Sequence, residues 1–170
     1  MHQIKIDSLT DGIEIVTLQE AKDYARVDTS ADDDLITSMI VSARQALETY
    51  LSRDIVGKTR TYWIPSSIDG CIEIPFAPVT SITSVESNSE ALPYTSYGLD
   101  DVYIQLSSYP ASNIQITYVT TGMTQDELKT SIKMLVSTYY DNREDYVDGT
   151  INVLPIDARQ RVSGLKYMFV

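Results

Sequence analysis

Cysteine, histidine and long hydrophobic runs are nearly absent from this chain of 170 residues. The single cysteine, Cys71, excludes an intrachain disulfide framework. The single histidine, His2, lies at the start of the sequence, so a Ser/His/Asp or Cys/His site would lack a buried base. We find no run of about 18 apolar residues and therefore expect no membrane-spanning helix. These absences remove disulfide-framed secreted scaffolds and most nucleophilic hydrolases from the candidates.

Positive charge is also scarce. The chain has 13 Lys and Arg against 24 Asp and Glu, which gives a net charge of −11. Binding to a nucleic-acid backbone or to anionic lipid needs basic residues, so both are disfavoured. The last quarter, residues 126–170, is nearly neutral, with seven acids and six bases. An acidic body with a near-neutral end predicts two surfaces that face different partners.

A long amphipathic helix is the strongest structural signal. Apolar residues recur at spacings of one, three and four over about residues 31–52, and no glycine or proline interrupts them. Ser30 is a good N-cap, and residues 32–34, three consecutive aspartates, complement the positive end of the helix dipole. A weak cation site formed by Asp28 and residues 32–34 is the alternative, but a calcium loop would alternate its ligands. The pattern favours an acidic helix start.

Three further helices are predicted. Residues 17–20 (Thr-Leu-Gln-Glu) form a capping box for a short helix. A second capping box at residues 124–127 (Thr-Gln-Asp-Glu) precedes a helix over about 125–143. Residues 157–161 form a short basic segment that we expect to be helical.

Between the helices, the hydrophobic period changes to two. Short β-branched and aromatic runs, separated by Pro, Gly and Asp, predict an antiparallel meander or sandwich. The runs are 61–64, 71–74, 79–85, 102–106 and 113–119. The sequence therefore predicts one α+β domain with protruding ends.

Signals of catalysis are weak. Cys71 alternates with isoleucines in a strand pattern, as an inert small residue would. The sequence has neither a glycine-rich phosphate loop nor a Cys/His metal cluster, so we expect no cofactor and no metal site. Paired carboxylates are a matter of spatial arrangement, which keeps a small acidic hydrolase or sugar-binding module as an alternative. We expect a protein that is not an enzyme.

Residues near the C-terminal end of the sequence suggest contacts with another chain. The apolar segment 167–170 (Tyr-Met-Phe-Val) packs either on its own core or on another chain, since Met and aromatics are enriched in interface cores. Arg159 and Arg161 precede it and either pair with an acidic partner or a neighbouring copy, or form a solvated helix face. Tyrosine, enriched at interfaces, accounts for 12 residues, Tyr139 and Tyr140 among them.

The order of these motifs resembles the head–tail connector (adaptor) proteins of tailed bacteriophages, the gp6-like and gp15-like family. The resemblance covers roughly residues 17–167. The matching segments are 17–22 (Thr-Leu-Gln-Glu-Ala-Lys), 32–36 (Asp-Asp-Asp-Leu-Ile), 74–79 (Ile-Pro-x-x-Pro-Val), 92–94 (Leu-Pro-Tyr), 116–122 (Ile-Thr-Tyr-Val-Thr-Thr-Gly) and 139–144 (Tyr-Tyr-Asp-Asn-Arg-Glu).

The resemblance implies a helical bundle with an inserted small antiparallel β-domain. Residues 1–170 would form a single connector domain, with helical parts at 17–54 and 124–145, a β-rich insertion at 55–122 and a C-terminal docking segment at 146–170. The family's usual ending is matched by Leu154-Pro155 and Arg161, whereas Gly164 departs from it.

The resemblance also implies a function without catalysis. Such proteins form a ring, usually a dodecamer, under the portal protein at the head–tail interface of the virion, after assembly in the host cytoplasm. The ring extends the DNA channel and supports stopper, nozzle or tail proteins, and an acidic channel wall lets DNA slide without specific binding. No membrane is involved. A neck or tail-completion protein that contacts the tail instead of the portal is the alternative.

Two groups of residues follow as candidate contact sites. The portal-docking candidates are Arg159, Arg161, Leu165, Tyr167, Met168 and Phe169, and the ring-contact candidates are Tyr139, Tyr140, Arg143 and Glu144.

Overall fold

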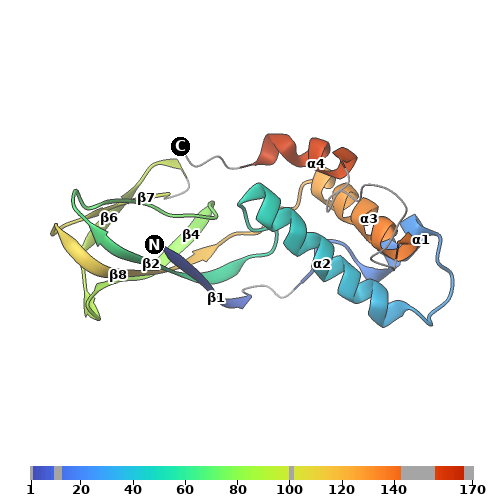
Figure 1. Ribbon diagram of the computed structural model, residues 1–170, viewed down its shortest axis with the longest axis horizontal. Coiled ribbons are helices and arrows are strands. Elements are labelled where there is room, and N and C mark those ends of the chain that lie inside the picture. Colours follow the sequence, from blue (N-terminus) through green and yellow to red (C-terminus); the bar gives the residue numbers. More distant parts are fainter. Residues whose placement is uncertain (1, 10–12, 100–101, 143–155, 167–170) are drawn as a thin grey trace. The chain divides into compact units, whose positions relative to one another are not determined.

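The computed structural model describes residues 2–9, 13–99, 102–142 and 156–166 (Figure 1). The chain divides into two compact units. The β unit comprises residues 1–12 and 56–122, and the helical unit comprises residues 13–55 and 123–170. Helices and antiparallel sheets occur together, which confirms the α+β class. The single connector domain inferred from the resemblance stays a prediction.

The helical unit contains all four predicted helices. They are α1 (Leu18–Ala25), α2 (Asp33–Leu51), α3 (Asp126–Asp141) and α4 (Ile156–Val162), which a short 3-10 helix, η2 (Ser163–Leu165), follows. Their apolar faces share one core, in which Ile36, Leu47, Leu128 and Leu135 are completely buried. Within the described residues, no helix is long and apolar enough to cross a membrane.

The start of α1 confirms its predicted capping box. The side chain of Thr17 accepts a hydrogen bond from the backbone N–H of Glu20 at 3.2 Å, and the Glu20 carboxylate accepts one from the N–H of Thr17 at 2.8 Å. At α2 the prediction of Ser30 as N-cap is wrong, because the cap is Asp32. The hydroxyl of Thr29 accepts the N–H of Ala31 at 3.0 Å, which stabilises a turn before the helix begins.

The capping box predicted at Thr124 is also wrong. The N-cap of α3 is Gln125, which makes no side-chain capping bond. Because the helix begins one residue later than expected, Glu127 occupies the second helical position instead of the third, from which a capping-box carboxylate reaches back. The acids Asp126 and Glu127 still lie in the first turn, where they favour the helix dipole.

The β unit contains two antiparallel sheets. The five-stranded sheet has the order β1-β2-β8-β4-β5, and the three-stranded sheet has the order β3-β7-β6. The strands are β1 (Gln3–Leu9), β2 (Lys58–Ser67), β3 (Cys71–Glu73), β4 (Val79–Ser87), β5 (Glu90–Ala91), β6 (Tyr94–Tyr97), β7 (Tyr103–Leu106) and β8 (Ala111–Thr120). All five predicted strands are present.

Sequence reasoning missed β1, β5 and β6. β1 is an edge strand that pairs with β2, and its isoleucines at positions 4 and 6 alternate with polar residues. His2, which precedes β1, forms a hydrogen bond between its Nδ1 and the hydroxyl of Tyr62 on β2.

Inward-facing side chains of both sheets form one core. Ile104 of the three-stranded sheet and Ile114, Ile116 and Tyr118 of the five-stranded sheet are completely buried. The hydroxyl of Tyr118 donates to the carbonyl of Pro75 at 2.8 Å, so the one polar atom of this buried ring is satisfied. The β unit thus has a core of its own.

Candidate functional site

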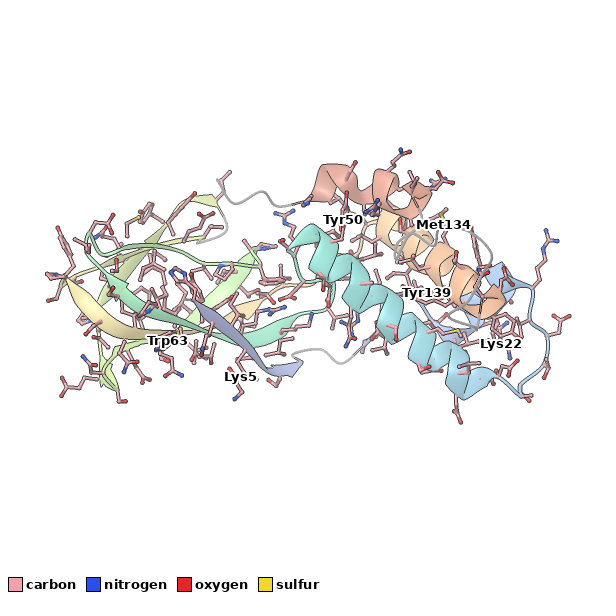
Figure 2. All side chains as sticks on the ribbon, viewed as in Figure 1. Lys5, Lys22, Tyr50, Trp63, Met134 and Tyr139 are labelled. Carbon is pink, nitrogen blue, oxygen red and sulfur yellow. The ribbon has the colours of Figure 1, made fainter. Side chains whose placement is uncertain are left out.

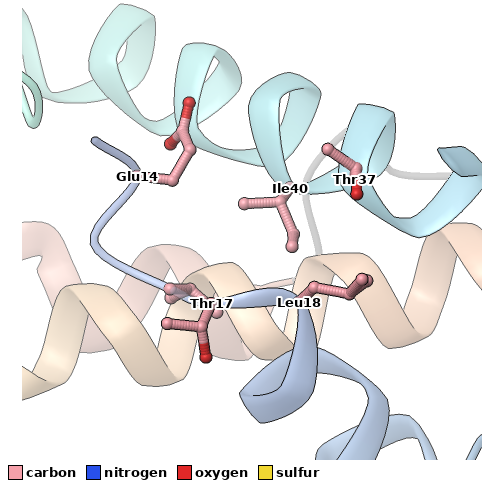
Figure 3. Close-up of a pocket in the computed structure, with 6 residues that line it drawn as sticks. Glu14, Thr17, Leu18, Thr37 and Ile40 are labelled. Atoms are coloured by element: carbon pink, nitrogen blue, oxygen red, sulfur yellow. The ribbon is translucent and has the colours of Figure 1, made fainter. Parts of the chain in front are cut away.

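A surface pocket of about 240 Å³ lies in the helical unit, between α2 and the segment that leads into α1 (Figure 3). Its lining residues are Glu14, Val16, Thr17, Leu18, Thr37 and Ile40. One carboxylate, that of Glu14, therefore faces the pocket. General acid–base chemistry of the hydrolase type needs a pair of carboxylates with different proton affinities, and this lining does not provide one.

The Glu14 carboxylate belongs to a buried ion-pair network. Its two oxygens accept hydrogen bonds from Nε of Arg44 at 2.8 and 3.0 Å, and Nη1 of Arg44 donates to Glu48 at 2.8 Å. Only 2% of the Arg44 side chain is exposed. Burial alone would lower the pKa of Arg44, because it disfavours the charged guanidinium. The hydrogen bonds and negative charges of Glu14 and Glu48 outweigh burial, so the pKa of Arg44 is raised. Glu48 also accepts the N–H of Ile55 at 2.9 Å, so the network joins the C-terminal half of α2 to the segment before α1 and to the segment just after α2.

The acidic residues at the start of α2 also have structural roles. Asp33 pairs with Nζ of Lys22 at 2.6 Å, and Asp32 accepts a hydrogen bond from the hydroxyl of Tyr140 at 2.7 Å. Asp33 and Asp34 occupy the first turn of α2, which confirms the acidic helix start. Among the described residues, no group of three or more His, Cys, Asp and Glu side chains is arranged to hold a metal ion.

Cys71 lies on the exposed side of the three-stranded sheet. Its sulfur is 3.0 Å from the hydroxyl of Tyr97, whose ring stacks on Tyr103 with the centroids 5.6 Å apart. The hydrogen bond with Cys71 raises the pKa of Tyr97. The backbone N–H of Cys71 donates to the carboxylate of Asp69 at 3.2 Å. The described contacts of Cys71 are those of a surface strand residue.

The basic segment near the end of the sequence is anchored to α2. Tyr50 lies in the last turn of α2 (Figure 2). The guanidinium of Arg159 and the ammonium of Lys166 lie 5.9 and 5.0 Å from its ring centroid. Cation–π attraction to Tyr50 therefore acts on Arg159, which precedes Gly164, and on Lys166, which follows it. Ala158 is completely buried, and its carbonyl accepts a hydrogen bond from the buried hydroxyl of Ser131 on α3 at 3.3 Å. These contacts hold residues 156–166 against α2 and α3.

The portal-docking candidates thus have different surroundings. Arg159 contacts Tyr50, Leu165 packs against the helical core, and Arg161 is exposed to solvent. Tyr167, Met168 and Phe169 lie outside the described residues.

The two described ring-contact candidates are half-buried in their own protomer. Tyr139 and Tyr140 pack against the helical core, and burial raises the pKa of Tyr139. Arg143 and Glu144 lie outside the described residues. The role of Tyr50 was missed by sequence reasoning, which placed this residue on the apolar stripe of α2. No sequence signal connects an aromatic at position 50 with cations more than one hundred residues later.

Comparison with known proteins completes the description of the site. Two structures with similar folds are the neck of an empty GTA particle, computed with C6 symmetry, and the neck of a native GTA particle, computed with C12 symmetry. The first has a TM-score of 0.75 at 15% identity, and the second has a TM-score of 0.73 at 13% identity. Both comparisons cover 99% of this chain and 97% of the other. At this identity the likeness concerns the fold.

A third similar structure, of the virion of a native gene transfer agent (GTA) particle, has a TM-score of 0.75 at 14% identity, with 99% of this chain and 97% of that chain covered. None of the curated proteins matches the chain. The sequence model of one family, described as head completion protein, matches residues 14–152. That match spans both units and most of the sequence, and the chain therefore belongs to the head completion protein family.

Proposed function

We propose that this protein is a head–tail connector that forms a ring under the portal, extends the DNA channel and supports stopper, nozzle or tail proteins. Membership in the head completion protein family makes it a structural protein of the virion, located at the head–tail interface. The match to that family over residues 14–152 is the observation that carries the proposal.

The proposed ring contains twelve copies of the chain. The similar folds come from necks with C6 and C12 symmetry, and this supports a cyclic assembly of twelve copies. A closed ring needs a heterologous interface, in which one face of each copy fits a different face of the next. We assign part of this contact to the C-terminal end of α3, with Tyr139, Tyr140, Arg143 and Glu144. In this proposal the four helices act as a bundle that packs against its neighbours.

Portal docking is assigned to the segment that begins with α4. Arg161 is the described arginine of this segment that points to solvent, whereas Arg159 contacts Tyr50. We therefore give Arg161 the charge contact with the portal and Arg159 the task of holding α4 in place. The apolar residues Leu165, Tyr167, Met168 and Phe169 would add buried contact area beside that charge.

The charge of the chain supports a passive role toward DNA. A net charge of −11 per copy makes the ring strongly acidic, and an acidic wall repels phosphates instead of binding them. DNA would then pass through the channel without specific contacts.

Binding of the purified chain to purified portal tests the proposal. We expect removal of residues 165–170 to abolish binding, and Arg161→Glu to weaken it about tenfold, because a charge-assisted contact turns repulsive. Lys129→Glu makes the same change of charge on α3 and should leave binding unchanged. Binding that ignores the truncation and Arg161→Glu would contradict the docking assignment. Binding to tail proteins in place of portal would favour the alternative, a tail-completion protein.

A further inference from the structure

An open sheet edge in the β unit has no part in the function proposed above. β1 pairs with β2 on one side, and among the described residues no strand pairs with its other side. Residues 2–8 are all exposed. Ile4 and Ile6 are 40% and 51% exposed, although they lie on the sheet face that carries the core. An exposed edge of this length is a template for pairing with another strand.

The polar side chains of β1 carry charges of both signs. Nζ of Lys5 lies 3.1 Å from Oδ1 of Asp7, and the hydroxyl of Thr61 on β2 donates to the same carboxylate. Lys5 projects from β1 into solvent, and 79% of its side chain is exposed (Figure 2). A lysine on an edge strand ordinarily blocks pairing by repelling its own copy. Here Asp7, two residues away, can neutralise it.

We propose that β1 of one copy pairs with β1 of a second copy as antiparallel strands, with the register centred on Ile6. In this register Lys5 lies opposite Asp7 of the second copy, and Asp7 lies opposite its Lys5. Ile6 lies opposite Ile6. Opposite charges directly across an antiparallel pair are favourable, and the paired isoleucines cover apolar surface that each copy leaves exposed.

Other pairings of this edge are less favourable. A register centred on Lys5 places two lysines directly opposite each other, which is repulsive. The opposite edge of the same sheet is β5, which has only two residues, Glu90 and Ala91. If β1 paired with β5 of a second copy, the carboxylate of Glu90 would lie against the apolar face that carries Ile4 and Ile6. The register of β1 against β2 shifts between Ile6 and Ser8. In the proposed pairing, residues 3–5 of one copy lie opposite residues 7–9 of the other, so every pair except that of Ile6 with Ile6 includes a residue at or beyond this irregularity. We therefore expect a weak, reversible dimer.

This dimer and the connector ring are alternative assemblies. Pairing of β1 with β1 is isologous and creates a two-fold axis, whereas neighbours in a cyclic ring are related by a heterologous contact. The dimer therefore describes the protein before it joins the ring. It protects an exposed edge during that time.

Disulfide trapping of the full chain tests the register. In a Cys71→Ser background, Ile6→Cys places two thiols on directly opposed residues, whose Cα atoms are about 5 Å apart, within the range of a disulfide. Ile4→Cys is the matched control, because the two copies of residue 4 would be roughly 13 Å apart along the strands. We expect a covalent dimer from Ile6→Cys under mild oxidation and none from Ile4→Cys. Equal cross-linking of both variants, or none from Ile6→Cys, would overturn the proposal.

Charge exchange measured by sedimentation velocity gives a second test. Lys5→Asp and Asp7→Lys each place like charges opposite each other twice, so either change should weaken dimerisation about tenfold or more. The double variant restores opposite charges and should restore the dimer, as should a mixture of the two single variants. Glu90→Lys, on the other edge, should have no effect. Failure of both rescues would overturn the proposal, while portal binding of the same variants tests the connector function separately.

Discussion

The two units solve the same problem, a stable core in a small acidic protein, in different ways. The helical unit places charge inside: Arg44, Glu48 and Lys22 are buried and paired. The β unit also buries two cations, Lys58 and Arg60, and the guanidinium of Arg60 lies 3.9 Å from the ring centroid of Phe76. It differs from the helical unit in the number of large apolar side chains that it leaves exposed. Among the described residues, the exposed large hydrophobic side chains of the β unit are Ile4, Ile6, Ile68, Tyr97, Leu99, Tyr103 and Tyr109, and those of the helical unit are Ile13, Tyr24, Leu35 and Ile156.

This difference shows where each unit is sensitive to change. In the helical unit, stability depends on a few ion pairs that cannot lose a partner without leaving a buried charge. In the β unit, stability is distributed over the many backbone hydrogen bonds that join β2, β8 and β4. The exposed apolar side chains of this unit are available for contacts with other molecules.

Arg44→Met should have the largest effect. It leaves the carboxylates of Glu48 and Glu14 without their cation, and loss of one partner from a buried pair costs about 3–5 kcal/mol of unfolding free energy. Chemical denaturation of the two proteins measures this. Arg44→Lys, which keeps the charge, should lose less. Equal, small losses for both variants would mean that the interior ion pairs are not what stabilises the helical unit.

Truncation of the cores should come next and should affect both units alike. Ile116→Ala in β8 and Leu135→Ala in α3 each remove a completely buried side chain, and we expect losses of about 2–4 kcal/mol in both cases. Denaturation followed by tryptophan fluorescence reports on the β unit, which contains Trp63, and circular dichroism at 222 nm reports on the helices. A loss below about 1 kcal/mol for one variant would show that its unit lacks a rigid core.

Tyr50→Leu should have a smaller and more local effect. It removes the aromatic face from Arg159 and Lys166, at about 0.5–1 kcal/mol for each cation. Hydrogen exchange of the amides of residues 156–166 should become faster, while that of α2 stays slow. Tyr50→Phe keeps the ring and should behave like the wild type. Unchanged exchange in Tyr50→Leu would show that the contacts with Ala158 alone hold α4.

The smallest effect should come from the α1 cap, and it should depend on pH. Hydrogen bonds from Thr17 lower the pKa of Glu20 below its ordinary value of 4.5, so the bound carboxylate stabilises the folded state above that pH. This stabilisation disappears as the pH falls through the lowered pKa of the folded state. Glu20→Gln should cost under about 1 kcal/mol at pH 7 and progressively less as the pH falls below 4.5, by thermal denaturation. A cost that stays the same at acidic pH as at pH 7 would contradict the charge-dependent cap.

Sequence periodicity predicted the elements whose pattern is long or repeated. α2 and α3 carry apolar stripes of four or more turns, and both lie within two residues of the expected bounds. β1 was missed because two isoleucines at the start of a chain are too short a pattern, and its partner β2 lies about fifty residues later. The misplaced caps at Ser30 and Thr124 have one cause. A capping motif can form at several neighbouring residues, and tertiary contacts select among them.

The candidate site was less predictable than the fold because its contacts join distant residues. The basic segment with Arg159 and Arg161 was recognised from composition, but its separation into an anchored and an exposed arginine depends on Tyr50. Arg44 was likewise read as one residue of a long helix. Only the folded chain brings Glu14, thirty residues earlier, to its guanidinium.

In the function that we propose, this protein acts by its position and shape at the junction of head and tail. A cryo-EM reconstruction of the neck of the particle that contains the chain tests it most directly. We expect a closed ring of copies with this fold between the portal and the tail, with α4 against the portal. A reconstruction that places the chain away from that junction, or whose neck contains no such ring, would contradict it.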